Sequence, residues 1–293
     1  MFNLGRQVKK VKLFFLSKIK IKFYKIYIFL ISIGGIYKFI TTNKKKSDIK
    51  KFSKNLDEIN DYEYKFRSQN NEDGIIDKIL SKITDNQINS IEIGLDYYEN
   101  NSLNLLKRNG KYLLIEGNAE KCIILKVIVN LFYKKKNIKI INTLVNKDNI
   151  NKLIKDSFLD EEIDFLSIDV DSIDYFLFEN LNVFPKLICI EYNHWLGKDR
   201  SITIPYNPNF FWDQSDCYFG SSLLALNKLA NKKDYYLVAI DSSGTNAFFV
   251  HGKLKDKFTI LDPIKSFKKP EKYSDEDSKA VWNIIKDKAF ISI

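Results

Sequence analysis

The chain has 293 residues, of which 45% are hydrophobic and 14% aromatic, so it can bury a full core and global disorder is not expected. Its net charge of +10 is confined to one end, because residues 1–47 hold 12 of the 47 basic residues and no acid. The remainder holds 35 basic and 37 acidic residues, which argues against a nucleic-acid-binding face on the main body. The three cysteines form no C-x-x-C pair, so the sequence predicts a reducing compartment, without a disulfide framework or a thiolate zinc site.

The N-terminal segment, residues 1–47, joins basic residues to the uncharged run 26–37. A spanning helix needs about 20 apolar residues, and the run is shorter than this even when it is extended to Ile40. The pattern favours a segment that lies on an anionic membrane surface, where each nearby Lys or Arg contributes about 1 kcal/mol. A true span, a secretory signal without a small-residue cleavage site and a solvated basic helix are the alternatives. Residues 48–61 are predicted to be a linker.

The body, residues 62–260, alternates short β-branched segments with segments of helical periodicity, which predicts one α/β domain. Strands are expected at 90–94, 112–116, 138–144, 165–169, 187–191, 236–240 and 247–251. Helices are expected at 75–84, 101–109, 119–134, 148–156, 173–181 and 221–231. Segments such as FLSIDV and LICIEY are apolar on both faces, as in a parallel sheet that helices cover on both sides.

The last two strands are separated only by residues 241–246, which leaves no room for a crossover helix and predicts an antiparallel hairpin. Five parallel strands followed by such a hairpin is the order of the class I methyltransferase sheet, a doubly wound, mostly parallel, seven-stranded Rossmann-like fold. Residues 261–293 are predicted to be a C-terminal tail that packs on this domain.

Acidic and amide side chains follow the carboxyl ends of four strands, where the ligand crevice of an open α/β sheet lies. They are Glu92 and Asp96 at the first strand, Glu116 at the second, Asp169 and Asp171 at the fourth, and Glu191 and Asn193 at the fifth. A carboxylate near buried strands is costly unless it is paired or used, so this coincidence indicates a site. For a single residue, such as Asp171 or Asn101, capping of the next helix is the alternative.

Individual positions suggest roles. Glu116, at the end of the second strand, is placed to bind both hydroxyls of a ribose. Gly94 lacks a Cβ and lets the backbone turn tightly and approach a ligand. The amide nitrogens that open the predicted helix at Asn101 could receive a carboxylate or phosphate.

A long insertion, residues 194–219, follows the fifth strand and is rich in Trp, Tyr, Phe, Asn and Pro. Long loops inside compact domains are usually functional, and this composition suits a polyhydroxylated acceptor. The alternative is that aromatic residues such as Trp212 only pack the loop down. His194 is either a general base or a hydrogen-bonded structural histidine.

Eight segments between residues 68 and 254 carry a family pattern in this order: SQNNEDGIIDKIL, IEIGLDYYENNSLNLL, YLLIEGNAEK, DFLSIDVDSIDYFLFENL, PKLICIEYN, IPYNPNFFWDQSDCYFGSSLLAL, YYLVAID and NAFFVHGKL. Together they resemble the FkbM-type methyltransferases of the S-adenosylmethionine-dependent class I superfamily. The LSIDVD, IEYN and NAFFV blocks carry most of the resemblance.

The resemblance implies transfer of a methyl group from S-adenosylmethionine, most often to a hydroxyl of a sugar or natural product. The residues expected to bind the cofactor are Glu92, Gly94, Asp96, Asn101, Glu116 and Asn118. The candidates for catalysis are Asp169, Asp171, Glu191 and His194. The residues expected to bind the acceptor are Asn193, Tyr206, Trp212 and Tyr218. No metal ligand is assigned.

Two positions depart from the family pattern, because Tyr97 and Ser172 stand where the family usually has glycine. Two interpretations therefore stay open. One is an active O-methyltransferase for a saccharide or lipid-linked glycan; the other is a methyltransferase-like protein that has lost catalysis and binds a glycan or protein partner. Because S-adenosylmethionine is a cytoplasmic metabolite, the first predicts a cytoplasmic enzyme, peripheral on the inner membrane face through residues 1–47, with no nucleic-acid partner.

Overall fold

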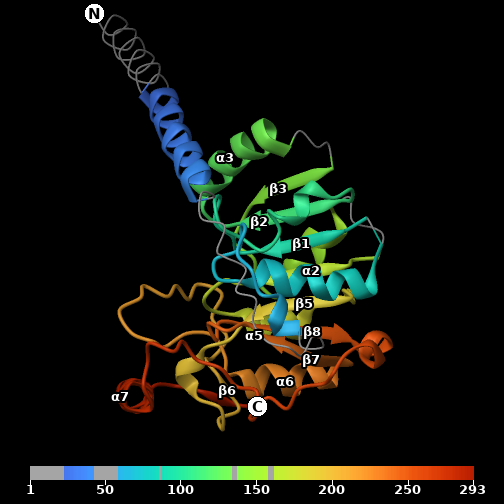
Figure 1. The fold of residues 1–293 in the computed structure, drawn as a ribbon. Helices are drawn as coiled ribbons and strands as arrows, with labels where there is room; N and C mark the ends of the chain where they lie inside the picture. The colour runs from blue at the N-terminus through green and yellow to red at the C-terminus, as the bar shows by residue number, and fades with distance from the viewer. Residues whose placement is uncertain (1–22, 43–58, 86, 134–136, 158–161) are drawn as a thin grey trace, which may run out of the picture.

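The computed structural model describes residues 23–42, 59–85, 87–133, 137–157 and 162–293 (Figure 1). At its centre is a seven-stranded sheet of order β3-β2-β1-β4-β5-β8-β7. The strands are β1 Ser90–Ile93, β2 Tyr112–Glu116, β3 Ile138–Asn142, β4 Phe165–Ile168, β5 Leu187–Glu191, β7 Tyr235–Ile240 and β8 Asn246–His251. Pairs among the first five are parallel, and β8 runs antiparallel to both neighbours. The predicted fold, a doubly wound, mostly parallel sheet with a terminal hairpin, is confirmed.

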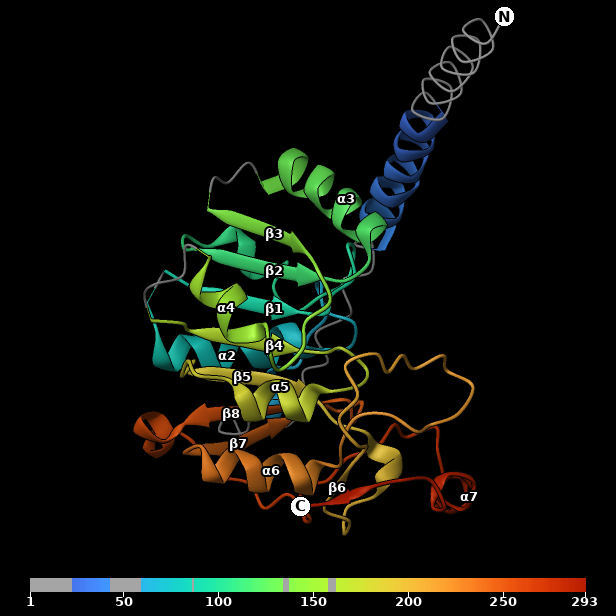
Figure 2. The same ribbon diagram turned by 180° about the vertical axis from the view of Figure 1, so that it is seen from behind.

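Helices cover both faces of the sheet, as its fully buried strands require (Figures 1 and 2). They are α2 Glu72–Ile83, α3 Ala119–Ile128, α4 Ile150–Lys155, α5 Asp174–Asn180, α6 Leu223–Lys232 and α7 Asp275–Ile285. One apolar core joins α4, α5 and α6 to the sheet, and a second core joins α2 and α3 to its other face. A π-helical turn, η3 Val129–Tyr133, extends α3.

The hairpin between β7 and β8 is closed by Asp241, whose carboxylate accepts hydrogen bonds from the amides of Thr245 and Asn246. Gly244 takes the left-handed φ of +69° that this tight turn needs. The local turn chemistry therefore fixes the antiparallel pairing at this edge.

The predicted helix at 101–109 does not form; only a short 3₁₀ turn, η2 Leu105–Lys107, is present there. The amides that would open a helix are already used. Those of Ser102 and Leu103 donate to the Asn100 side chain at 3.1 and 2.9 Å, and Glu92 accepts from Asn101 and Ser102. Side-chain acceptors that capture backbone donors locally compete with helix formation.

The N-terminal segment contributes a 20-residue helix, Phe23–Thr42, which is longer than the apolar run in the sequence. Among the described residues it is one helix that is long and apolar enough to cross a membrane by length and composition alone. Part of it packs on α3: a Cβ at Gly35 would lie 2.3 Å from the Ile124 side chain, and Phe39 is 1% exposed. The rest extends beyond the body (Figures 1 and 2). Residues 1–22 and 43–58 lie outside the described residues.

The residues just before the body contact the sheet. A 3₁₀ turn, η1 Ile59–Tyr62, buries Ile59, and the Asn60 side chain donates to the Ile240 carbonyl at 2.7 Å. Residues 59–61, assigned to the linker from sequence, are therefore held against β7.

The C-terminal residues lie against the insertion. Two short strands, β6 Ile202–Thr203 and β9 Ile291–Ser292, pair antiparallel in a second small sheet. The Tyr218 hydroxyl donates to the Ala289 carbonyl at 2.5 Å. The end of the chain thus ties down the loop that follows β5.

Candidate functional site at the carboxyl edge of the sheet

Three carboxylates meet where β4 and β5 end. Asp169, Asp171 and Glu191 are half-buried, and one oxygen from each lies within 4.8 Å of the others. Burial, together with the charge of Asp171, raises the pKa of Asp169 well above its ordinary value. Burial and the charge of Asp169 raise the pKa of Glu191 in the same way. Carboxylates this close can share a proton, accept one from a substrate or hold a divalent cation, although no metal ligand is expected from sequence.

The loop after β4 is held by Asp174, a residue that is 1% exposed. Its two oxygens accept from the amides of Val170 and Ser172 at 2.8 and 2.9 Å, and burial raises its pKa to about 6. This clamp holds Asp171 at a left-handed φ of +54°. Because the N-cap of α5 is Ile173, Asp171 does not cap that helix, and the capping alternative is wrong for it.

The side of the site near β1 depends on Gly94. Its φ is +75°, and a Cβ there would lie 1.7 Å from the Asp169 carbonyl oxygen, so no other residue fits where the chain leaves β1. Beyond it, Asp96 forms an ion pair with Lys121 at 3.2 Å through one oxygen. The other oxygen of Asp96 is buried and has no hydrogen-bond partner among the residues described. This oxygen can therefore accept a hydrogen bond from a ligand in the loop that follows β1.

Glu116 ties together the ends of β1 and β2. Its carboxylate accepts from the Leu95 amide at 3.0 Å and from the Asn118 amide at 2.6 Å. A carboxylate has about four lone-pair positions, so two remain for a ligand. Asn118 itself is exposed and caps α3 by accepting from the Glu120 and Lys121 amides. Capping therefore explains Asn118 without a ligand.

Two residues expected to bind the cofactor lie beneath the loop instead. Glu92 is 2% exposed and accepts from the amides of Asn101 and Ser102 at 2.8 and 2.7 Å; burial raises its pKa to about 7. Asn101 is also buried, and its side chain donates to the Ser167 hydroxyl at 3.1 Å. The fold thus uses Glu92 to hold the amides that were expected to face a ligand, and the role of both residues in cofactor binding stays a prediction.

On the acceptor side, Asn193 also has a structural role. It is 1% exposed, and its side-chain amide donates to the carbonyls of Cys217 and Phe219 at 2.8 and 2.9 Å. These bonds pin the end of the insertion to the end of β5. Trp212 stacks on Phe219 with ring centroids 4.1 Å apart and donates to the Asp216 carbonyl, so the packing alternative holds for it.

Two other predicted residues, Tyr206 and His194, each have a buried polar atom without a hydrogen-bond partner among the described residues. Tyr206 packs its ring 5.2 Å from that of Phe176, and its buried hydroxyl has no hydrogen-bond partner among the described residues. His194 lies between Trp195 and Tyr273, with centroid distances of 4.5 and 5.9 Å. Burial and nearby lysines lower the pKa of His194 to about 4, so it is neutral at neutral pH and lies in an aromatic stack outside the carboxylate cluster.

The sequence analysis assigned no role to Glu72, a further buried acid at the start of α2. It accepts from the Asn246 side chain at 2.9 Å, and burial with the charge of Asp241 raises its pKa to about 7. In the sequence, Glu72 is marked only by the local stretch NEDG. Its hydrogen-bond partner Asn246 lies 174 residues away in β8, so sequence reasoning could not pair the two. Lys121, the partner of Asp96, was missed because it reads locally as an ordinary helix-surface lysine.

No protein-family model matches the chain, and no curated protein is significantly similar to it in sequence. Among solved structures, it is similar to an S-adenosylmethionine-dependent methyltransferase from Aquifex aeolicus, at 13% identity and a TM-score of 0.37, over 59% of this chain and 87% of that chain. It is similar to a putative O-methyltransferase from Klebsiella pneumoniae, at 13% identity and a TM-score of 0.39, over 62% and 80% of the two chains. A methyltransferase from Clostridium acetobutylicum matches at 9% identity and a TM-score of 0.39, over 61% and 89%.

Proposed function

We propose that this chain is an S-adenosylmethionine-dependent methyltransferase of the FkbM type that methylates a hydroxyl of a saccharide or lipid-linked glycan. The observation that carries the proposal is the cluster of Asp169, Asp171 and Glu191 at the carboxyl edge, directly beside Gly94 of the first loop. In a doubly wound sheet this edge is where ligands bind.

The residues at the ends of β1 and β2 fit this cofactor. The free oxygen of Asp96 suits the ammonium group of the methionine end, and the remaining lone pairs of Glu116 suit ribose hydroxyls. Gly94 keeps a side chain out of the space between them and Asp169. When bound, the cofactor supplies a methyl group that is already activated on a sulfonium.

The contribution of the protein is then to orient the acceptor and remove its proton. An aligned acceptor gains most of its rate from proximity, and a positioned base adds about 10²–10⁴-fold. The raised pKa values of Asp169 and Glu191 make either residue a stronger base than an ordinary carboxylate once it is ionised. His194, with its low pKa, is the weaker candidate.

One observation favours the second interpretation, a protein that binds its partner without catalysis. Tyr97, which replaces the usual glycine, packs against Tyr98 with ring centroids 5.1 Å apart in the loop that follows β1. A filled loop of this kind could exclude the cofactor.

We further propose that the enzyme is cytoplasmic and peripheral on the inner membrane face. The support is the helix Phe23–Thr42, whose apolar side chains are largely exposed, and the excess of basic residues in 1–47. Liposome flotation with and without residues 1–47 tests attachment, and protease protection in cells tests the side of the membrane.

Calorimetric titration of the full chain with S-adenosylhomocysteine tests the enzymatic proposal. Saturable binding is expected, and Glu116→Gln is expected to weaken it about tenfold, the loss of one hydrogen bond to a charged group. The matched control is Glu179→Gln on the exposed surface of α5, which leaves affinity unchanged. Absence of binding by either S-adenosylmethionine or its homocysteine product would refute an active enzyme and favour the non-catalytic binder.

A further inference from the structure

A pocket of about 420 Å³ lies on the face of the body covered by α2 and α3, next to the N-terminal helix. Its walls come from the segment before α2, from η2 and from η3, the turn that extends α3. The lining residues are Phe66, Arg67, Leu106, Lys107, Phe132 and Tyr133. None of them belongs to the site at the carboxyl edge.

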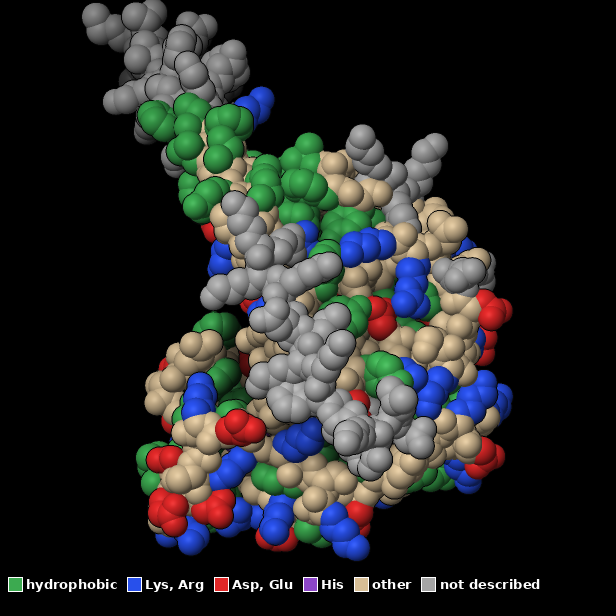
Figure 3. All heavy atoms as spheres, viewed as in Figure 1, with side chains coloured by type: hydrophobic (Ala, Val, Ile, Leu, Met, Phe, Trp, Pro, Cys, Tyr) green, Lys and Arg blue, Asp and Glu red, His purple; other side chains and the backbone are tan. Residues whose placement is uncertain are grey.

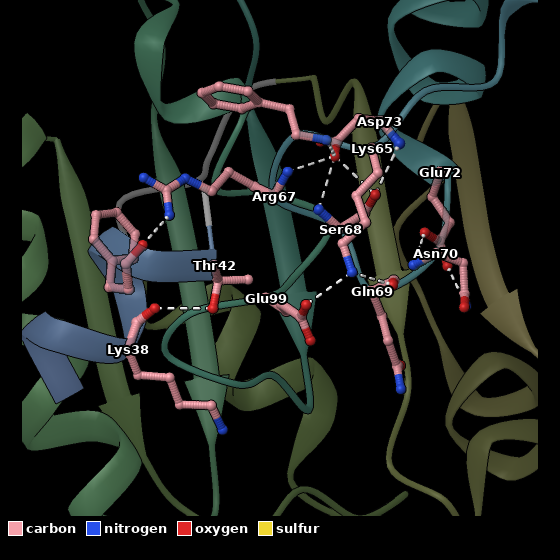
Figure 4. Close-up of polar contacts among 12 residues, drawn as sticks. Lys38, Thr42, Lys65, Arg67, Ser68, Gln69, Asn70, Glu72, Asp73 and Glu99 are labelled. Atoms are coloured by element: carbon pink, nitrogen blue, oxygen red, sulfur yellow. Dashed lines mark hydrogen bonds and ion pairs between the residues drawn. The ribbon is translucent and has the colours of Figure 1, made fainter. Parts of the chain in front are cut away.

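The pocket contains a buried guanidinium that stacks on the Phe39 ring, 3.5 Å from its centroid, and forms no ion pair with a described residue. Arg67 is 7% exposed, and one terminal nitrogen donates to the Phe39 carbonyl at 3.0 Å (Figure 4). Its Nε is buried and has no hydrogen-bond partner in the part of the chain that the structure describes. One oxygen of the buried Asp73 accepts from the amides of Phe66, Arg67 and Ser68, each at 2.7 Å. Its other oxygen has no hydrogen-bond partner among the described residues, so Asp73 attracts Arg67 through its charge without forming an ion pair with it.

A second cation shares the pocket. Lys107 is exposed, with its Nζ 3.3 Å from the centroid of the Phe66 ring and 3.4 Å from the Asn104 side-chain oxygen. Burial and the charge of Arg67 lower the pKa of Lys107, and burial lowers the pKa of Arg67. The cost of burial falls mainly on Arg67, because Lys107 is exposed. Neither cation forms an ion pair with a carboxylate of the described residues, so an anion that contacts both would offset this cost.

Hydrophobic side chains surround these two charges. Phe66, Leu106 and Phe132 form the apolar walls, and Phe132 packs against Phe39 of the N-terminal helix with ring centroids 5.0 Å apart. Outside the pocket, exposed apolar side chains continue over the end of α3 and along the helix, as Figure 3 shows. The site therefore offers cationic donors at one end and an apolar path toward the helix at the other.

We propose that this pocket binds an anionic membrane lipid, with its phosphate between Arg67 and Lys107 and its acyl chain along Phe132 toward the N-terminal helix. Guanidinium and ammonium groups form charge-assisted hydrogen bonds with phosphate. The charge of the N-terminal segment favours a membrane lipid over a free phosphate as the ligand. Residues 1–47 carry 12 basic residues and no acid, so they are attracted to an anionic membrane surface. The lipid would hold the body at a fixed orientation beneath its helix, whether or not the chain transfers methyl groups.

The test uses the full chain and a soluble probe, monomeric dihexanoyl-phosphatidylglycerol below its critical micelle concentration, titrated by calorimetry. Saturable binding is expected, with inorganic phosphate at least tenfold weaker. Lys107→Gln is expected to weaken lipid binding about tenfold, the loss of one charge-assisted hydrogen bond. The matched control is Lys78→Gln, which removes a lysine with a similar ring contact, 3.9 Å from Tyr62, outside the pocket.

A second pair of variants separates the lipid from a free anion. Phe132→Ser is expected to weaken binding of the lipid severalfold while leaving that of inorganic phosphate unchanged, and Leu131→Ser, its exposed neighbour outside the pocket, is expected to change neither. If wild type and Lys107→Gln bind the lipid with equal affinity, the proposal that its phosphate binds at Lys107 in this pocket is wrong. Phosphate binding as tight as lipid binding would overturn the membrane source.

Discussion

The two halves of the carboxyl edge use their acids in opposite ways. Under the loop after β1, Glu92 is almost fully buried and each of its oxygens accepts from a backbone amide. At the ends of β4 and β5, Asp169 and Glu191 are half-buried and crowd one another and Asp171. The same residue type at the same kind of strand end is thus structural in one half and available for chemistry in the other. The difference depends on which backbone donors the fold directs at each carboxylate.

The largest expected effect that tests this comparison is the pH dependence of stability. The pKa values of Glu72 and Glu92 in the folded protein are about 7, and that of Asp174 is about 6, all above their ordinary values. Between about pH 4 and pH 7 the folded protein therefore holds protons that the unfolded chain has lost. Stability is expected to fall as pH rises through this window, by up to about 1.4 kcal/mol per pH unit for each group. Urea denaturation at pH 5, 6, 7 and 8 measures this; a stability that rises with pH contradicts it.

Replacing Glu92 is expected to lower the free energy of unfolding more than replacing any of the three acids at the ends of β4 and β5. Glu92→Gln turns an amide donor toward the buried amide of Asn101 or Ser102, which should lower the free energy of unfolding by about 1–3 kcal/mol. Urea denaturation at pH 8 measures the loss. An unchanged midpoint would mean that the loop does not depend on Glu92.

Asp169→Asn is not expected to destabilise the protein, in contrast to Glu92→Gln. Removing one charge relieves the repulsion within the cluster, so the free energy of unfolding at pH 8 should stay the same or rise by about 0.5–2 kcal/mol. Binding of S-adenosylhomocysteine should persist, while methyl transfer falls by about 10²–10⁴-fold. A destabilisation comparable to that of Glu92→Gln would show that the two halves do not differ.

The smallest effect is expected for the two positions that depart from the family pattern. Neither Tyr97 nor Ser172 has a positive φ, and Ser172 is 8% exposed with its hydroxyl donating to the Val170 carbonyl at 3.0 Å. Glycine at both positions should therefore lower stability by about 0.5–1 kcal/mol each and leave the affinity for S-adenosylhomocysteine within about twofold. Calorimetric titration of the variants with S-adenosylhomocysteine measures this. A tenfold gain in affinity would mean that Tyr97 and Ser172 obstruct the cofactor site, which favours the interpretation that catalysis has been lost.

Local pattern was enough to predict most of the sheet. The periodicity of apolar residues predicted all seven strands within one or two residues, and the short gap after Ile240 predicted the hairpin. It also placed Asp169, Asp171 and Glu191 at one edge, because parallel strands end on the same side. The helix predicted at 101–109 failed because Glu92 and Asn100 capture its first amides, and periodicity carries no record of such competition.

By itself, the sequence determined the order of the strands, the basic and apolar N-terminal segment and the acids that follow the strands, since these depend on local period and composition. Only the tertiary structure decided which acids remain available. Glu92 and Asn193 are consumed by backbone partners up to 26 residues away, and Asp96 keeps one oxygen free because Lys121 takes only the other. It alone brought Arg67, Lys107 and Phe132 around one pocket beside the N-terminal helix. Whether a polar group finds a hydrogen-bond partner depends on distances in three dimensions. The amino-acid sequence alone does not give these distances.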